Sequence, residues 1–153
     1  MDKVIENLKA RFGEGILGVE EAADGVKVVY ASPAVAKELL RYLREGEGFE
    51  TLTDLTAIDW LGKKSPRFEV VYQLRSYSRK LFIRVKVPTD GEVDSVIDIW
   101  PGAAFMEREC WEMFGINFRG HKLRHLLLWD GFPGHPLRKD FYWREDVPLP
   151  DNR

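Results

Sequence analysis

The sequence is poor in the residues from which several kinds of functional site are built. Cys110 is the only cysteine among 153 residues, which excludes a disulfide within the chain and leaves an iron–sulfur cluster without its usual four or so ligands. No stretch approaches the roughly 20 apolar residues that a membrane-spanning helix needs. The formal net charge is only −2, so the chain as a whole has no field that would attract nucleic acid or an anionic membrane.

Sequence signatures of nucleotide and metal sites are also missing. The chain has no Gly-x-Gly-x-x-Gly after a strand, no Walker-type loop and no His-Glu-x-x-His. Its three histidines are too few, with one cysteine, for a typical zinc site, so we predict no bound metal. The first residues include acids where a signal peptide would have an apolar run, and we therefore expect a cytoplasmic protein.

What is present predicts an α+β core with an extension. A content of 44% hydrophobic and 31% charged residues is typical of a globular chain. We assign the core domain to residues 1–118 and an irregular, extended C-terminal docking arm to residues 119–153, which is not an independent domain. Apolar spacing and turn residues predict a mostly antiparallel sheet with helices packed on one side. The predicted helices are 2–12, one beginning at Ser32-Pro33, 94–99 and 103–114, and the predicted strands are 16–19, 26–30, 50–61, 67–75 and 81–87.

The helix predicted over 103–114 carries one acidic residue within its apolar arc. At 100° per residue, Glu107 falls between Phe114 and Trp111, whereas Arg108, Glu109 and Glu112 point the other way, with Arg108 and Glu112 close enough to pair. A carboxylate on an apolar face needs a partner. Two interpretations follow: Glu107 forms a structural salt bridge with an arginine such as Arg124 or Arg138, or it handles protons with a raised pKa.

The last third of the chain mixes charge of both signs with aromatic side chains. Between residues 119 and 146, six basic residues against four acidic ones leave only a small local excess of positive charge, and tryptophan, phenylalanine and tyrosine are interleaved with them. Arginine and aromatic residues are the types that dominate protein–protein interfaces. A solvated tail seldom carries so much aromatic surface. The pattern therefore predicts a segment that docks on another protein.

Three motifs in the same region resemble a known family. Glu107-Arg108-Glu109-x-x-Glu112-Met113-Phe114-Gly115-Ile116, Gly120-His121 with Leu123-Arg124, and Gly134-His135-Pro136-Leu137-Arg138-Lys139-Asp140 are similar to the signature of the C subunit of NADH-quinone oxidoreductase, the 30 kDa-type subunit of respiratory complex I. The segments 54–59 and 67–72 look like core strands of this family. The resemblance covers residues from about 54 to 142.

The resemblance implies a peripheral-arm subunit that carries no cofactor itself, in a complex that holds FMN, iron–sulfur clusters and quinone. The complex oxidises NADH, reduces quinone and translocates protons. Its 30 kDa-type subunit packs on the quinone-site (49 kDa-type) subunit and neighbouring iron–sulfur subunits at the cytoplasmic face of the cell membrane, without a membrane span or nucleic acid. An equivalent subunit of a membrane-bound hydrogenase or another donor-linked dehydrogenase complex is the alternative within the family.

The family signature supplies the candidate docking residues. We predict that Glu107, Arg108 and Glu109 fix the base of the arm by ion pairs. The remaining candidates are expected at the interface with the quinone-site subunit: Arg124, His135, Pro136, Leu137, Arg138, Lys139 and Asp140. We expect no catalytic site in the isolated chain and no ordered arm without its partners.

Two rival functions come from other classes of protein. One is a free-standing hydrolase with Glu107 and His135 as an acid–base pair, although the sequence offers no nucleophile or metal for it. The other is an RNA-binding module that uses the basic and aromatic tail, which the net charge of −2 disfavours.

Overall fold

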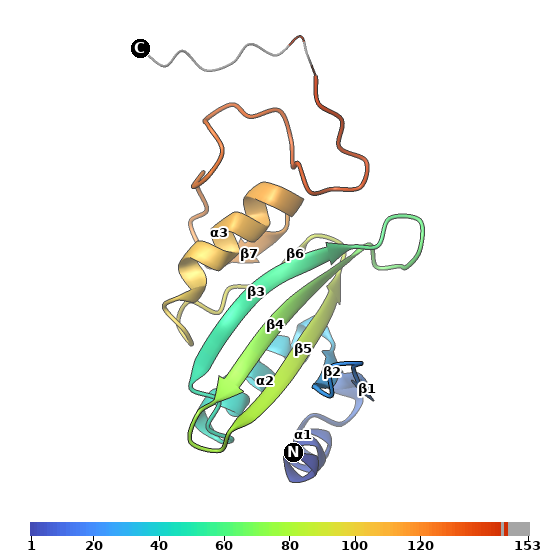
Figure 1. Ribbon diagram of the computed structural model, residues 1–153, viewed down its shortest axis with the longest axis vertical. Coiled ribbons are helices and arrows are strands. Elements are labelled where there is room, and N and C mark those ends of the chain that lie inside the picture. The colour runs from blue at the N-terminus through green and yellow to red at the C-terminus, as the bar shows by residue number, and fades with distance from the viewer. Residues whose placement is uncertain (145, 147–153) are drawn as a thin grey trace.

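The computed structural model describes residues 1–144 and 146. Within these residues, three α-helices and seven strands follow one another, with a short 3₁₀ turn, η1 (Gly13–Gly15), after the first helix (Figure 1). The helices are α1 (Asp2–Phe12), α2 (Pro33–Glu45) and α3 (Ala103–Phe114). The strands are β1 (Ile16–Glu21), β2 (Lys27–Ala31), β3 (Thr51–Asp59), β4 (Phe68–Ser76), β5 (Leu81–Thr89), β6 (Glu92–Asp94) and β7 (Asn117–Arg119).

Five of the strands form one sheet in the order β1-β2-β5-β4-β3. Every neighbouring pair is antiparallel except β2 and β5, which run parallel. The alternating segments predicted as a hairpin are β4 and β5, with Val70 opposite Val87 and Gln73 opposite Arg84. The predicted α+β class with a mostly antiparallel sheet is therefore confirmed.

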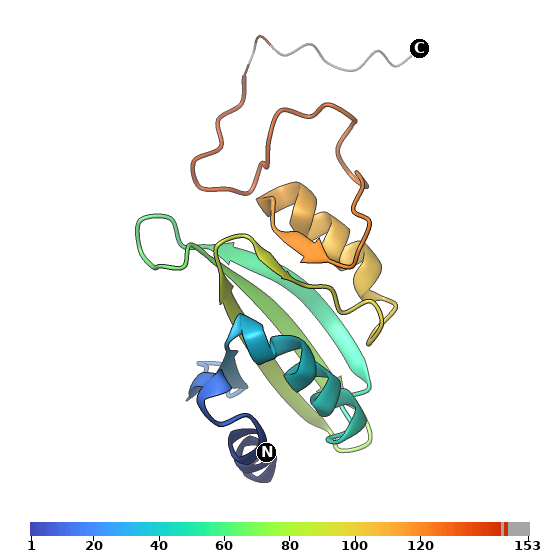
Figure 2. The same ribbon diagram turned by 180° about the vertical axis from the view of Figure 1, so that it is seen from behind.

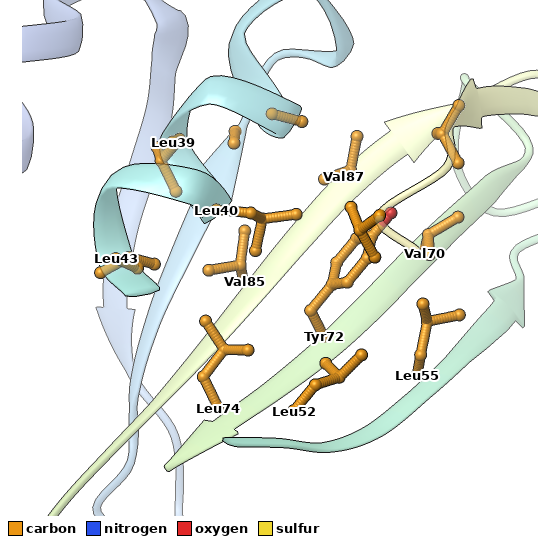
Figure 3. Close-up of a cluster of buried hydrophobic side chains, with 14 of the residues drawn as sticks. Leu39, Leu40, Leu43, Leu52, Leu55, Val70, Tyr72, Leu74, Val85 and Val87 are labelled. Atoms are coloured by element: carbon orange, nitrogen blue, oxygen red, sulfur yellow. The ribbon is translucent and has the colours of Figure 1, made fainter. Parts of the chain in front are cut away.

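The helices bury their apolar faces against one side of this sheet. Leu39, Leu40 and Leu43 of α2 pack over Val85 and neighbouring side chains of the central strands (Figure 3), and all are buried. The same core takes in apolar residues of α1 and α3. Seen from behind, α2 lies across the sheet with α3 beside it (Figure 2). The opposite side of the sheet carries the polar members of the alternating pattern.

The predicted helix boundaries follow from local chemistry. Ser32 accepts a hydrogen bond from the Ala34 N–H at 3.4 Å, with Pro33 in the first turn of α2. At the other end of the fold, α3 stops at Gly115, which has φ 73° and donates its N–H to the Trp111 carbonyl. The helices predicted over 2–12 and 103–114 are confirmed residue for residue.

The short helix predicted over 94–99 is wrong. Residues 92–94 form β6, which pairs in parallel with β7 in a second, two-stranded sheet, and a turn follows at 97–99. The Ser95 N–H donates to the Arg119 carbonyl, and the Val96 N–H donates to the Glu107 carboxylate. The β6–β7 pairing, continued by the Ser95 bond, holds residues 92–95 alongside β7, so no helix can begin at residue 94.

Beyond β7, the described part of the arm, residues 120–144 and 146, contains no helix or strand. It lies beside α3, at the end of the molecule opposite α1 (Figure 1). Within the described residues, no helix is long and apolar enough to cross a membrane. The arm and α3 together form the region that the sequence singles out for function.

Candidate docking site

Helix α3 is the platform on which the arm rests. The helix packs on β3. Besides Ala103, its buried residues are Glu107, Cys110, Glu112 and Phe114. Two of these four are carboxylates with 0% and 1% of their surface exposed. Buried carboxylates need hydrogen-bond partners to remain charged, and both find them in segments outside the helix.

Glu107 joins the helix to the first residues of the arm. Its Oε1 accepts the Val96 N–H at 2.7 Å, and its Oε2 lies 2.7 Å from Ser95 Oγ and 2.8 Å from His121 Nδ1. The predicted salt bridge from Glu107 to Arg124 or Arg138 is therefore wrong. The loop after β6 and the start of the arm cover this side of α3, and they occupy both carboxylate oxygens.

Glu112 collects the backbone amides of the next arm segment. Its carboxylate accepts the N–H groups of Leu126, Leu127 and Leu128, with the Leu127 N–H at 2.9 Å from Oε2, and His125 Nδ1 lies 3.1 Å from Oε1. Burial opposes ionisation, but these hydrogen bonds outweigh it and hold the pKa of Glu112 below its usual range. From its position on the helix, the Glu112 side chain is predicted to lie on the outer, exposed face. It is buried because the arm folds over it.

Arg108 also holds the arm, through the backbone. Its Nε donates to the Arg124 carbonyl at 3.2 Å and its Nη2 donates to the His125 carbonyl at 3.0 Å. The predicted pairing of Arg108 with Glu112 along the helix is therefore wrong, since each side chain is engaged with the arm. Arg108 and Glu112 together hold residues 124–128 by main-chain groups, which leaves most side chains of that segment free.

The segment 134–138 caps the C-terminal end of α3. His135 Nδ1 lies 2.9 Å from the Glu112 carbonyl, the Leu137 N–H donates to the Met113 carbonyl at 3.0 Å, and Arg138 Nε donates to the Phe114 carbonyl at 2.6 Å. The last carbonyls of a helix have no partner within the helix. Here the arm supplies one to each of three successive carbonyls.

Close approach of the arm requires the glycine that follows α3. A Cβ on Gly115 would lie 2.5 Å from Arg138 Nη2 and 2.6 Å from His135 Cδ2. Gly115 also has a positive φ of 73°, which side-chain-bearing residues adopt at a cost. Its position at the helix end therefore serves both the turn and the packing of the arm.

A buried ion pair fixes the next residues to the sheet. Arg67 donates to both oxygens of Asp59 at 2.8 Å and to Asp140 Oδ1 at 2.7 Å, and the Lys139 N–H donates to Asp59 Oδ2 at 2.8 Å. The hydrogen bonds from Arg67 lower the pKa of Asp59 to about 2, against the opposing effect of burial. Sequence reasoning missed Asp59 and Arg67; their only signal is that both lie at adjoining ends of the predicted strands.

Outside these contacts, the arm presents apolar and aromatic side chains to solvent. Trp129, Phe132, Phe141 and Trp143 form a cluster in which ring centroids lie between 4.9 and 6.2 Å apart. Trp143 is exposed and the other three rings are half-buried. Large apolar side chains are also exposed elsewhere on the arm and on α3: Phe105, Leu126, Leu127, Leu137 and Tyr142. A concentration of aromatic and leucine surface of this kind marks interaction sites.

The side chains of three other candidate residues take no part in holding the arm. The Glu109, Arg124 and Lys139 side chains are exposed, and none makes a side-chain hydrogen bond or ion pair with another described residue. Pro136 lies half-buried in the turn. The structure thus brings most of the predicted docking residues to one end of the molecule, and their pairing with another subunit stays a prediction.

The histidine contacts near α3 differ from those that the rival hydrolase would need. Glu107 contacts His121, whereas His135 contacts a carbonyl, so the acid–base pair of the rival hydrolase does not form. Burial raises the pKa of the Cys110 thiol, which keeps it protonated and packed as a small apolar side chain. Across residues 1–144 and 146, no three histidine, cysteine or acidic side chains gather as metal ligands. The contacts described above instead hold the arm in a defined conformation against α3 and β3.

Comparison with known proteins identifies the family. Residues 29–147 match the family described as "Respiratory-chain NADH dehydrogenase, 30 Kd subunit". The C subunit of the NADH-quinone oxidoreductase of Geobacter sulfurreducens is 40% identical over 144 residues, which is 92% of this chain and 88% of that protein. That of Roseiflexus sp. is 41% identical over 143 residues, or 90% and 81% of the two chains.

A third relative has a composite name. The NADH-quinone oxidoreductase C/D subunit of Acidiphilium cryptum is 39% identical over 153 aligned residues, which cover 92% of this chain but 26% of that protein. The family match extends through α3 and the arm segments that contact it. The chain belongs to the family of the 30 kDa subunit of respiratory-chain NADH dehydrogenase.

Proposed function

We propose that this chain is a peripheral-arm subunit of a proton-translocating NADH:quinone oxidoreductase and docks on its quinone-site (49 kDa-type) subunit. The proposal rests on the different directions in which the main chain and the side chains of the arm make contacts. Its main chain bonds inward to Glu112 and Arg108, while its leucine and aromatic side chains face outward. Main-chain anchoring leaves those side chains available for a partner.

Anchoring before association favours binding. A segment that is already held in its bound shape loses less conformational entropy when it associates than a free tail does. The bonds from Glu107, Glu112 and Asp59 reach the arm at successive points between His121 and Lys139. The arm therefore offers a preformed surface, with the cluster of Trp129, Phe132, Phe141 and Trp143 as its aromatic anchor.

The composite relative supports the choice of partner. A protein with the combined name C/D, of which this chain spans about a quarter, places a C-type region in one chain with a D-type region. Two regions joined in one chain have a high effective concentration for each other, which favours contact between them. We take the D-type region to be the quinone-site subunit, with iron–sulfur subunits next to it.

The contribution of this chain to electron transfer would be assembly and positioning. FMN, the iron–sulfur clusters and the quinone would be held by other subunits, and this chain would bring none of them. Its place would be the cytoplasmic face of the cell membrane, reached through its partners. The donor is part of the proposal too, because a hydrogenase-type complex would use an equivalent subunit.

Affinity purification of the tagged chain from detergent-solubilised membranes tests the proposal. Wild type should recover the quinone-site, iron–sulfur and flavin subunits together with NADH oxidation. Leu137→Asp, at a side chain 53% exposed on the arm, should abolish recovery, because a charge in an apolar interface loses its hydration. Leu17→Asp, at a leucine 57% exposed on β1, is the matched control and should recover the complex normally. Recovery of hydrogenase-type partners, or of the chain alone, would contradict the proposal.

A further inference from the structure

A hollow of about 410 Å³ opens where the arm leaves β7 and passes α3. Its walls are Ala104, Arg108, His121, Lys122 and Arg124. Two cations come from the arm and one from the helix, and no acidic side chain lines the hollow. Three permanent positive charges and a histidine therefore surround one concave space.

The three permanent charges form no ion pair with a described residue. Arg108 uses Nε and Nη2 on the carbonyls of residues 124 and 125, and its Nη1 makes no hydrogen bond with any described residue. The side chains of Lys122 and Arg124 make no hydrogen bond or ion pair within residues 1–144 and 146. Glu107, behind His121, gives both its oxygens to Ser95, Val96 and His121. Three cations thus face a single carboxylate behind His121, which leaves an excess of positive charge in the hollow.

We propose that this hollow receives an aspartate or glutamate side chain of the subunit on which the arm docks. The Arg124 guanidinium offers a carboxylate a fixed fork of donors, Arg108 can add its Nη1, and the Lys122 ammonium adds a mobile point charge. The inference rests on the proposed docking function, since it assigns one contact of that same surface. The outward aromatic cluster would supply apolar contact area, and the hollow would fix register by charge.

Zero-length cross-linking of the intact complex tests the contact. A carbodiimide joins an amine to a carboxylate only when the two touch, so Lys122 should become linked to an acidic residue of another subunit. Acylation of Lys122 should fall about tenfold between the isolated chain and the complex, as expected for an amine held in an ion pair. Lys80, exposed in the turn between β4 and β5, calibrates the reagents. Protection without a cross-link, or equal acylation in both states, would overturn the proposal.

Charge reversal gives a second, independent readout. The double variant Lys122→Glu/Arg124→Glu should weaken association at least about tenfold, because like charges then face each other across the interface. Lys80→Glu is the control. If Leu137→Asp blocks assembly and the double reversal does not, docking by the arm stands and the carboxylate contact fails. If neither variant affects assembly, both proposals fail.

Discussion

Nδ1 of His121 lies 2.8 Å from Oε2 of Glu107, so that the first turn of the arm is tied to a carboxylate with no exposed surface. Glu107 and Glu112 thus attach the arm to α3 at two points, His121 and the backbone amides near Leu127. These hydrogen bonds form only when the chain is folded, and each of them can be tested separately.

Replacement of Glu112 by glutamine should release the arm between His125 and Leu128. The amide loses the charge, and its NH₂ group cannot accept the backbone N–H groups that the carboxylate accepts. We expect the free energy of unfolding to fall by about 1–3 kcal/mol. Hydrogen exchange at residues 126–128 should speed up, and Glu109→Gln, on the exposed side of the same helix, should change neither quantity. Unaltered hydrogen exchange at residues 126–128 in Glu112→Gln would show that Glu112 does not hold this segment of the arm.

Gly115→Ala should be more harmful than an alanine at a glycine of similar backbone geometry. Gly62 has φ 74° and open space within 4 Å of the position that a methyl group would take, whereas a methyl group on Gly115 would meet His135 and Arg138. Both substitutions carry the positive-φ cost of about 1–2 kcal/mol, and only Gly115→Ala adds a steric clash. Urea unfolding of the two variants measures the difference. Equal losses would show that the arm does not pack against the helix end.

Arg138→Ala should weaken both the fold and assembly. The substitution removes the donor to the Phe114 carbonyl and the packing of the guanidinium over Phe68, at 5.2 Å from the ring centroid. We expect a loss of about 1–2 kcal/mol in unfolding free energy and reduced recovery of the complex. Arg44→Ala, at an exposed arginine near the end of α2, is the control. Full assembly and activity of Arg138→Ala would argue against docking through this part of the arm.

The contribution of Asp59 to stability should disappear in acid. Its pKa is lowered from 3.8 to about 2, chiefly by the hydrogen bonds from Arg67, so the folded state binds the proton less readily than the unfolded state. The stabilisation is therefore complete above pH 3.8 and is lost as the pH falls through about 2. From the size of the shift it amounts to about 2 kcal/mol.

Urea unfolding of wild type and Asp59→Asn between about pH 5 and about pH 2 measures this contribution. The difference in unfolding free energy should be constant at the upper end of this range and shrink toward the lower end. Asp130→Asn provides the control, because the exposed Asp130 side chain makes no hydrogen bond with another described residue. A difference that is independent of pH would mean that the Asp59–Arg67 pair adds no stability.

Local elements were predictable where neighbouring residues decide them. The spacing of apolar residues and the glycine at 115 delimit α3, and alternation from Phe68 to Val87 defines the central hairpin. The segment 94–99 shows where this reasoning fails. Its helical pattern is overridden by bonds from Ser95 to Arg119 and from Val96 to Glu107, partners that lie 11 or more residues away.

The sequence by itself determined the α+β class, the family motifs, and the concentration of candidate residues around α3 and the arm. Only the tertiary structure decided how those residues pair. Glu107 meets His121 rather than an arginine, and Glu112 is buried although its helical position predicts exposure. The physical reason is that a buried carboxylate is satisfied by whichever donors the folded chain brings to it. Here those donors are main-chain amides and histidines of the arm, together with Ser95 and Val96 of the loop after β6, and no periodicity encodes their approach.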